Sequence, residues 1–199
     1  MIRAAIRAGG STMLVAFVFA AAAVAGGQTA RAGEASDAVG RAESLLAEGK
    51  VGEALNAFDG ATDAFWSALP LTFRTALFAE RIGSYGDYSN RADARFRSGE
   101  TALVYLEPVG FSWMPDGDGF KTSLETDLEI RSPSGLIFSK AEKFATIDKT
   151  SRTKVREINL AIRLTLPALK AGDYELKVTV RDLAGRKTAT ASLPFAIVE

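Results

Sequence analysis

The chain has 199 residues, a formal net charge of zero, and neither Cys nor His. Without Cys no disulfide can form, and without Cys or His the common zinc sites and the Ser-His-Asp and Cys-His catalytic arrangements are excluded. Carboxylate, Lys, Tyr and Ser chemistry remains, together with hard cations on oxygen ligands. We therefore expect no cofactor, and a binding function rather than an enzymatic one.

The first 32 residues have the three parts of a secretory signal peptide. Arg3 and Arg7 make a positive start, Met13–Ala25 is an apolar run, and Ala30-Arg31-Ala32 offers a cleavage site between small residues. An uncleaved membrane anchor is the alternative, although about 20 apolar residues are normally needed to cross a bilayer. The sequence predicts export to the periplasm or beyond, with no stable membrane span after cleavage.

Cleavage after residue 32 removes three Arg and no acid, so the net charge changes from 0 to −3. A mildly acidic chain has no basic excess to attract a phosphate backbone, and we expect no nucleic-acid partner. The remaining chain is long enough to bury a stable core without disulfides.

Residues 33–82 are predicted to form a helical hairpin region. Apolar residues recur at helical spacing before Gly49, which is placed to end a first helix. A second apolar stripe runs from Val51 until Pro70 stops it. A third short helix is expected over 71–82.

Part of this region resembles the middle of a tetratricopeptide repeat, in which small residues let two antiparallel helices pack closely. The matching pattern is Leu45-Leu46-x-x-Gly49-x-Val51-x-x-Ala54-Leu55-x-x-Phe58-x-x-Ala61. It covers about half a repeat and lacks the early aromatic and glycine. Because stable arrays need about three repeats, the preferred interpretation is an ordinary hairpin that packs on the following domain or on a partner.

From residue 99 onward the apolar period becomes two, as in strands whose side chains change face at every residue. Residues 83–98, rich in turn formers, are the predicted connector. The fold class is mainly β, an immunoglobulin-like antiparallel β-sandwich over 99–199 preceded by the N-terminal helical hairpin. The expected strands are 101–107, 111–113, 123–131, 136–140, 157–166, 174–182 and 188–198.

Two details favour this sandwich. The segment from Leu169 to Tyr174 resembles a tyrosine corner, in which the hydroxyl bonds a backbone group a few residues upstream; the alternative is a Tyr that simply faces the core. Pro194 interrupts the last strand, which predicts an edge or a bulge there.

The β region as a whole resembles a family of uncharacterised secreted bacterial proteins. The segments that carry the resemblance are Phe96-x-x-Gly99-Glu100, Val104-Tyr105-Leu106-Glu107-Pro108 and Leu193-Pro194-Phe195. The resemblance implies a compartment and a fold, and it implies no activity.

The segment before residue 115 is the first candidate site. Exposed together, Phe111, Trp113 and Met114 would form a patch suited to a sugar ring, a peptide or the apolar face of a partner. Buried, Trp113 would instead anchor the core or a domain interface, which is the preferred interpretation.

The next loop offers a weak metal site. Asp116 and Asp118, followed by Gly119, resemble part of a calcium loop. The twelfth position, where an EF-hand has a bidentate Glu, is Asp127 inside a predicted strand. A glycine-rich turn with solvated acids is the simpler interpretation.

Two charged segments complete the candidates. Glu125, Asp127 and Glu129 alternate along one strand face; glycan-cleaving enzymes need two carboxylates, but a solvated face is the preferred interpretation. The predicted loop 147–157 carries Lys149, Arg152, Lys154 and Arg156, which could meet a polysaccharide or a lipid head group or simply be solvated.

These observations predict an exported, non-enzymatic binding or assembly protein of the bacterial cell envelope, with a protein or glycan partner. The alternative is a carboxylate-dependent cell-envelope hydrolase or glycan-processing accessory.

Overall fold

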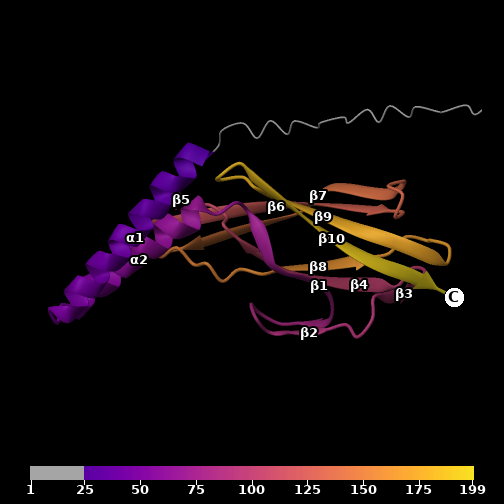
Figure 1. Cartoon of the computed structure of the whole chain (residues 1–199). Coiled ribbons are helices and arrows are strands. Elements are labelled where there is room, and N and C mark those ends of the chain that lie inside the picture. Colours follow the sequence, from indigo (N-terminus) through magenta and orange to yellow (C-terminus); the bar gives the residue numbers. More distant parts are fainter. Residues whose placement is uncertain (1–24) are drawn as a thin grey trace, which may run out of the picture.

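The computed structural model describes the chain from residue 25 to residue 199, with side chains from residue 33 onward. Its described part is mainly β, with two helices followed by ten strands in two sheets (Figure 1). Most of the predicted signal peptide lies outside the described residues, and residues 25–32 begin the first helix. Neither helix of the described chain is long and apolar enough to cross a membrane.

Helices α1 (Ala25–Ala47) and α2 (Val51–Ala68) lie side by side as an antiparallel pair, which we call the helix pair (Figure 1). Gly49 ends α1 in a left-handed conformation with φ +76°, and its N–H donates to the Leu46 carbonyl at 3.0 Å. The buried side chains of the pair are small: Ala35, Ala42, Ala54 and Ala61. The two helices therefore approach closely and leave their larger apolar side chains outside the contact.

The prediction of a third helix over 71–82 is wrong, because Thr72–Ile82 forms strand β1. This strand pairs with β4 (Thr101–Val109) and buries Phe78 in the core. Residues such as Ala76 and Leu77 favour a helix locally, but sheet pairing and burial outweigh that preference.

The first sheet has four strands, all paired antiparallel, in the order β2-β1-β4-β8. Strand β2 (Tyr88–Asn90) comes from the predicted connector, and β8 (Leu160–Thr165) is the core of the predicted strand 157–166.

The second sheet has six strands, in the order β3-β10-β9-β6-β5 with β7 also paired to β6. Its pairs are antiparallel except for β3 with β10. Three strands of this sheet differ from the prediction. Strand β5 follows the expected strand 111–113, β7 extends well beyond the expected strand 136–140, and β3 lies within the predicted connector 83–98. The bounds are β3 Arg95–Arg97, β5 Met114–Asp116, β6 Gly119–Arg131, β7 Ile137–Ser151, β9 Gly172–Asp182 and β10 Lys187–Val198.

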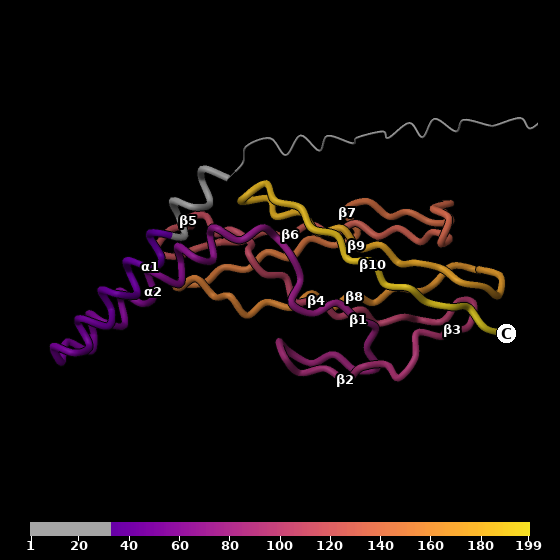
Figure 2. The backbone as a smooth tube through the Cα atoms, in the orientation of Figure 1, coloured from indigo at the N-terminus to yellow at the C-terminus, as the bar shows by residue number. Residues whose placement is uncertain are grey.

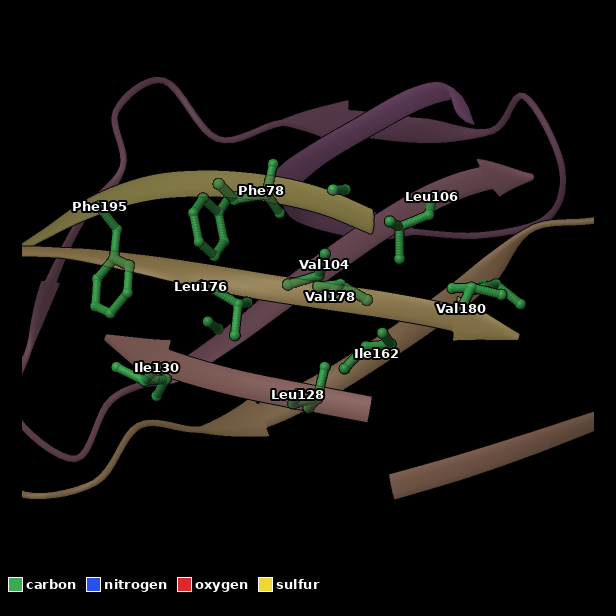
Figure 3. Packing of buried hydrophobic residues seen from close by; sticks show 14 of the residues in the cluster. Phe78, Val104, Leu106, Leu128, Ile130, Ile162, Leu176, Val178, Val180 and Phe195 are labelled. Atoms are coloured by element: carbon green, nitrogen blue, oxygen red, sulfur yellow. The ribbon is translucent and has the colours of Figure 1, made fainter. Parts of the chain in front are cut away.

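The two sheets face each other across one apolar core (Figure 3). Alternate residues of β4, β6, β8, β9 and β10 enter it, as the period of two predicts. Both sheets contribute fully or almost fully buried side chains, including Val104, Leu106, Leu160 and Ile162 from the first sheet and Leu128, Leu176, Val178 and Val180 from the second.

Tyr174 and Pro194 confirm two local predictions. The Tyr174 hydroxyl donates to the carbonyl of Lys170 at 2.9 Å, while its ring is buried and stacks on Phe195. Strand β10 pairs with β3 only from Ala196 onward, so its stretch at Pro194 is bonded to β9 on one side alone. A residue without an N–H is tolerated at such an edge.

Replacing Tyr174 by Phe should lower the free energy of unfolding by about 1 kcal/mol, because the carbonyl of Lys170 loses its hydrogen bond while the ring still packs. Urea unfolding followed by circular dichroism measures this. Tyr88→Phe, which keeps a ring stacked on Tyr105, is the matched control. Equal stability of the wild type and Tyr174→Phe would show that the hydroxyl does not fix the turn.

Candidate functional site

The helix pair carries an apolar groove of about 290 Å³ between its two helices. Leu46, Leu55 and Phe58 line it with exposed fractions of 59%, 61% and 54%. Val39 and Val51 complete the large apolar side chains of the groove. Soluble proteins seldom leave so many large apolar groups in water without a use for them.

The groove continues as an apolar stripe toward the C-terminal end of α2. Phe65 is 58% exposed and follows Leu55 and Phe58 on the same helical side. Together the exposed side chains of the groove and stripe present an apolar area on the order of 500 Å², at the upper end for the largest patch of a typical monomer. Figures 1 and 2 show that the turn of the helix pair points away from the sheets, so most of this surface is not covered by them.

The helix pair that carries this groove is strongly acidic. Residues 33–68 contain seven acidic and two basic side chains, and Glu43 lines the groove itself. The groove is thus lined by apolar side chains and by Glu43, and it lies on a helix pair with a net charge of −5.

A second hollow lies where the helix pair meets the sheets. Three aromatic rings that contact one another lie beside it. The Trp66 indole N–H donates to the Phe111 carbonyl at 2.7 Å, and the two rings meet edge to face at 5.2 Å. The Phe111 ring in turn contacts Trp113 at 5.5 Å. The patch predicted at Phe111, Trp113 and Met114 therefore needs correction: Phe111 is fully buried in the core, and only the half-buried Trp113 and the exposed Met114 can contact a ligand.

Basic side chains border these rings. Lys154 Nζ lies 2.8 Å from Asp63 Oδ2 of α2, and the Arg156 guanidinium bonds the other oxygen of the same carboxylate. The predicted basic loop 147–157 is wrong in its first part, because Lys149 belongs to β7, where pairing with β6 continues to Ser151. The remaining loop rests on α2 instead of extending into solvent.

These groups enclose a pocket of about 300 Å³, which we call the junction pocket. Its walls include Asp63, Trp66, Trp113, Lys154, Arg156 and Lys187. The indole N–H of Trp113 is buried and has no hydrogen-bond partner within the described chain. The sequence predicted candidate roles for Trp113, Lys154 and Arg156, but not for the other residues of the pocket. Asp63 and Trp66 lie near the end of a helix and Lys187 at the start of a strand, and no local sequence pattern shows that these segments meet the loop that carries Lys154 and Arg156.

The weak metal site at Asp116 and Asp118 gains no further ligands. Both side chains are exposed, and the Thr150 hydroxyl lies 3.5 Å from Asp116. Among the described side chains, no three acidic groups gather as they would around a metal ion. Calcium binding here stays a prediction.

The alternating acids of β6 are not the solvated face that the sequence predicted. Glu125 is buried, and Arg181 from the neighbouring strand β9 binds both Glu125, at 3.1 Å, and Asp127. The hydrogen bond from Arg181 lowers the pKa of Asp127. Because β6 lies between β9 and β7, cross-strand cations reach the row and engage it in ion pairs between strands.

A buried polar network covers the outer face of the first sheet. The Tyr105 hydroxyl donates to Glu107 at 2.7 Å and accepts from the Gly86 N–H at 2.8 Å, while Tyr88 stacks on its ring. Burial and the hydrogen bond to Glu107 raise the pKa of Tyr105 to about 12. The network holds the predicted connector against the sheet. Its polar groups bond to one another, so they point to no ligand.

Comparison with known proteins assigns no family. No family model and no curated protein matches this chain. Among solved structures, it is similar to the Pseudomonas fluorescens alkylpurine DNA glycosylase AlkC bound to DNA containing an abasic site analog, with 11% identity and a TM-score of 0.37 over 71% of this chain. The match covers 34% of that protein, so this chain spans about a third of its length.

Replacing Arg181 by Gln should raise the pH at which acid unfolds the protein. A lowered pKa at Asp127 contributes stability above the ordinary Asp value of about 3.9, and this stability is lost as the pH falls through the folded-state value. Without Arg181 the pKa of Asp127 returns toward its ordinary value, and we expect the acid-unfolding midpoint to rise by roughly 0.5 pH unit. Circular dichroism between acid and neutral pH measures it.

Lys149→Gln removes the same charge from an exposed position of β7 and is the control for that measurement. If both variants shift the midpoint equally, net charge and not the Arg181 contact sets the acid stability.

Proposed function

We propose that this chain is an exported, non-enzymatic binding protein of the bacterial cell envelope, in which an immunoglobulin-like β-sandwich carries a helical hairpin that receives an amphipathic helix of a partner protein. The observation that carries the proposal is the exposed apolar groove between α1 and α2. Two facing sheets and the Tyr174 hydrogen bond support the sandwich. The three-part N-terminal sequence supports export.

A helix is the occupant that fits the groove best. The groove runs beside residues 39–46 of α1 and 51–58 of α2, which is about two turns of each helix. An amphipathic helix presents side chains at i, i+3, i+4 and i+7, and such a row fits between two helices whose own contact is made by alanines. Burial of Leu55 and Phe58 would then supply the main favourable free energy.

The partner helix should be basic beside its apolar face. Residues 33–68 have a net charge of −5, so a positive helix is attracted, whereas a second copy of this chain or an anionic lipid surface meets like charge. Charge complementarity therefore selects a partner helix with Lys or Arg beside its apolar stripe.

The hydrolase alternative has no observation of comparable strength in its favour. Of its candidate carboxylates, Asp116 and Asp118 are exposed on a turn, and Glu125 and Asp127 are both engaged by Arg181. Two carboxylates that flank a scissile bond must instead face the substrate.

Two synthetic peptides test the proposed partner chemistry against the protein purified after export. One is an amphipathic helix with Leu on one face and Lys on its flanks, and the other has Glu in place of each Lys. Fluorescence anisotropy should show binding of the Lys peptide at least tenfold tighter than binding of the Glu peptide, a difference of about 1.4 kcal/mol. Leu55→Glu and Phe58→Glu should each abolish binding.

Asn56→Glu is the matched control, because it adds the same charge to α2 on the side away from the groove. Equal affinity for the two peptides would overturn the charge argument. Loss of binding in Asn56→Glu as large as in Leu55→Glu would overturn the groove. A concentration-dependent dimer in light scattering that Leu55→Glu dissociates would identify a second copy as the occupant and contradict the proposal.

A further inference from the structure

We propose that the junction pocket binds a sugar ring bearing a carboxylate, and that Asp63 occupies the place of that carboxylate in the free protein. The proposal concerns a different surface from the apolar groove and does not rest on it. It would give the protein an acidic saccharide as a second ligand.

The first observation is an excess of positive charge around the accessible carboxylate of Asp63. Lys154 and Arg156 both bind Asp63, and the side chain of Asp63 remains 34% exposed. Lys187 lines the same pocket, and Arg152 and Asp59 line an adjoining hollow of about 320 Å³ that shares Asp63, Lys154 and Arg156 with it, so the cations around Asp63 outnumber the acids. A carboxylate that enters from solvent can replace Asp63, because an Arg guanidinium offers a planar fork that matches any carboxylate.

The second observation is that aromatic surface lies beside those cations. Trp66 and Trp113 line the pocket and offer apolar ring surface against which a pyranose can lie. The Trp113 indole N–H is a donor without a partner in the described chain, and buried donors are normally paired. A pyranose ring with one acidic group meets both the aromatic rings and the cations, whereas a bare phosphate meets only the cations.

Attachment of the helix pair does not by itself account for this arrangement. Trp66 already holds α2 through the Phe111 carbonyl, and Lys187 donates to the Leu69 and Gly110 carbonyls at 2.9 and 2.7 Å. A partly exposed ion pair adds only about 0–1 kcal/mol to stability. The pocket volume of about 300 Å³ is at the lower end for ligand sites, which limits the occupant to a single ring.

Intrinsic fluorescence gives a direct assay, because Trp66 and Trp113 are the only two Trp in the sequence and both line the pocket. The protein purified after export is titrated with glucuronate, with glucose, and with inorganic phosphate. We expect a saturable change with glucuronate and at least tenfold weaker responses to the other two. A phosphate response equal to that of glucuronate would reduce the site to an anion site and overturn recognition of the ring.

Two substitutions should act in opposite directions. Lys154→Gln should weaken glucuronate binding at least tenfold, because a cation that contacts the carboxylate is lost. Asp63→Asn should strengthen it several-fold, because the internal competitor is removed while the cations remain. Glu53→Gln, elsewhere on α2, is the control and should change nothing.

A purely structural ion pair predicts a different pattern. In that case Asp63→Asn and Lys154→Gln would lower the melting temperature similarly and neither would alter a glucuronate response, which would overturn the proposal. If Asp63→Asn fails to fold, the Lys154→Gln titration still decides. Leu55→Glu should bind glucuronate as the wild type does, so failure of the apolar groove and failure of this site are distinguishable.

Discussion

The ammonium group of Lys187 is the contact that ties the end of the helix pair to the sheets through backbone carbonyls on both sides. It donates to the carbonyls of Leu69 and Gly110, joining the end of α2 to the segment before β5. The last carbonyls of a helix have no partner within it and carry partial negative charge, so a cation is well suited to them. Since Lys187 opens β10, and β10 pairs with β9 along almost its whole length, this attachment leads directly into the second sheet.

Rigid attachment at one end explains how the helix pair keeps its large apolar side chains exposed. The two helices contact each other through alanines, which bring little apolar area, and an isolated pair of this kind would be marginal. The sheets supply the stability that the helices lack. Leu55 and Phe58 are thereby free to face a partner, because the fold does not need their burial.

The period of two predicted the strands of the core well, because burial of one face imposes that period on each strand. It failed for β1, where Ala76 and Leu77 favour a helix and only the pairing with β4 decides the outcome. Tyr174 was predictable because its partner Lys170 is four residues away. The junction pocket was not, since Asp63 and Lys154 are 91 residues apart in sequence and no local pattern relates them.

The distribution of charge connects the two proposed sites. Residues 33–68 carry a net charge of −5, whereas residues 69–199 carry +2, so the mild acidity of the chain conceals two parts of opposite sign. Asp63 lies at their boundary, an acid of the helix pair held by cations of the sheet domain. The same separation of charge would direct the two proposed ligands, because the acidic helix pair attracts a basic helix and the cations at the junction attract an acidic sugar.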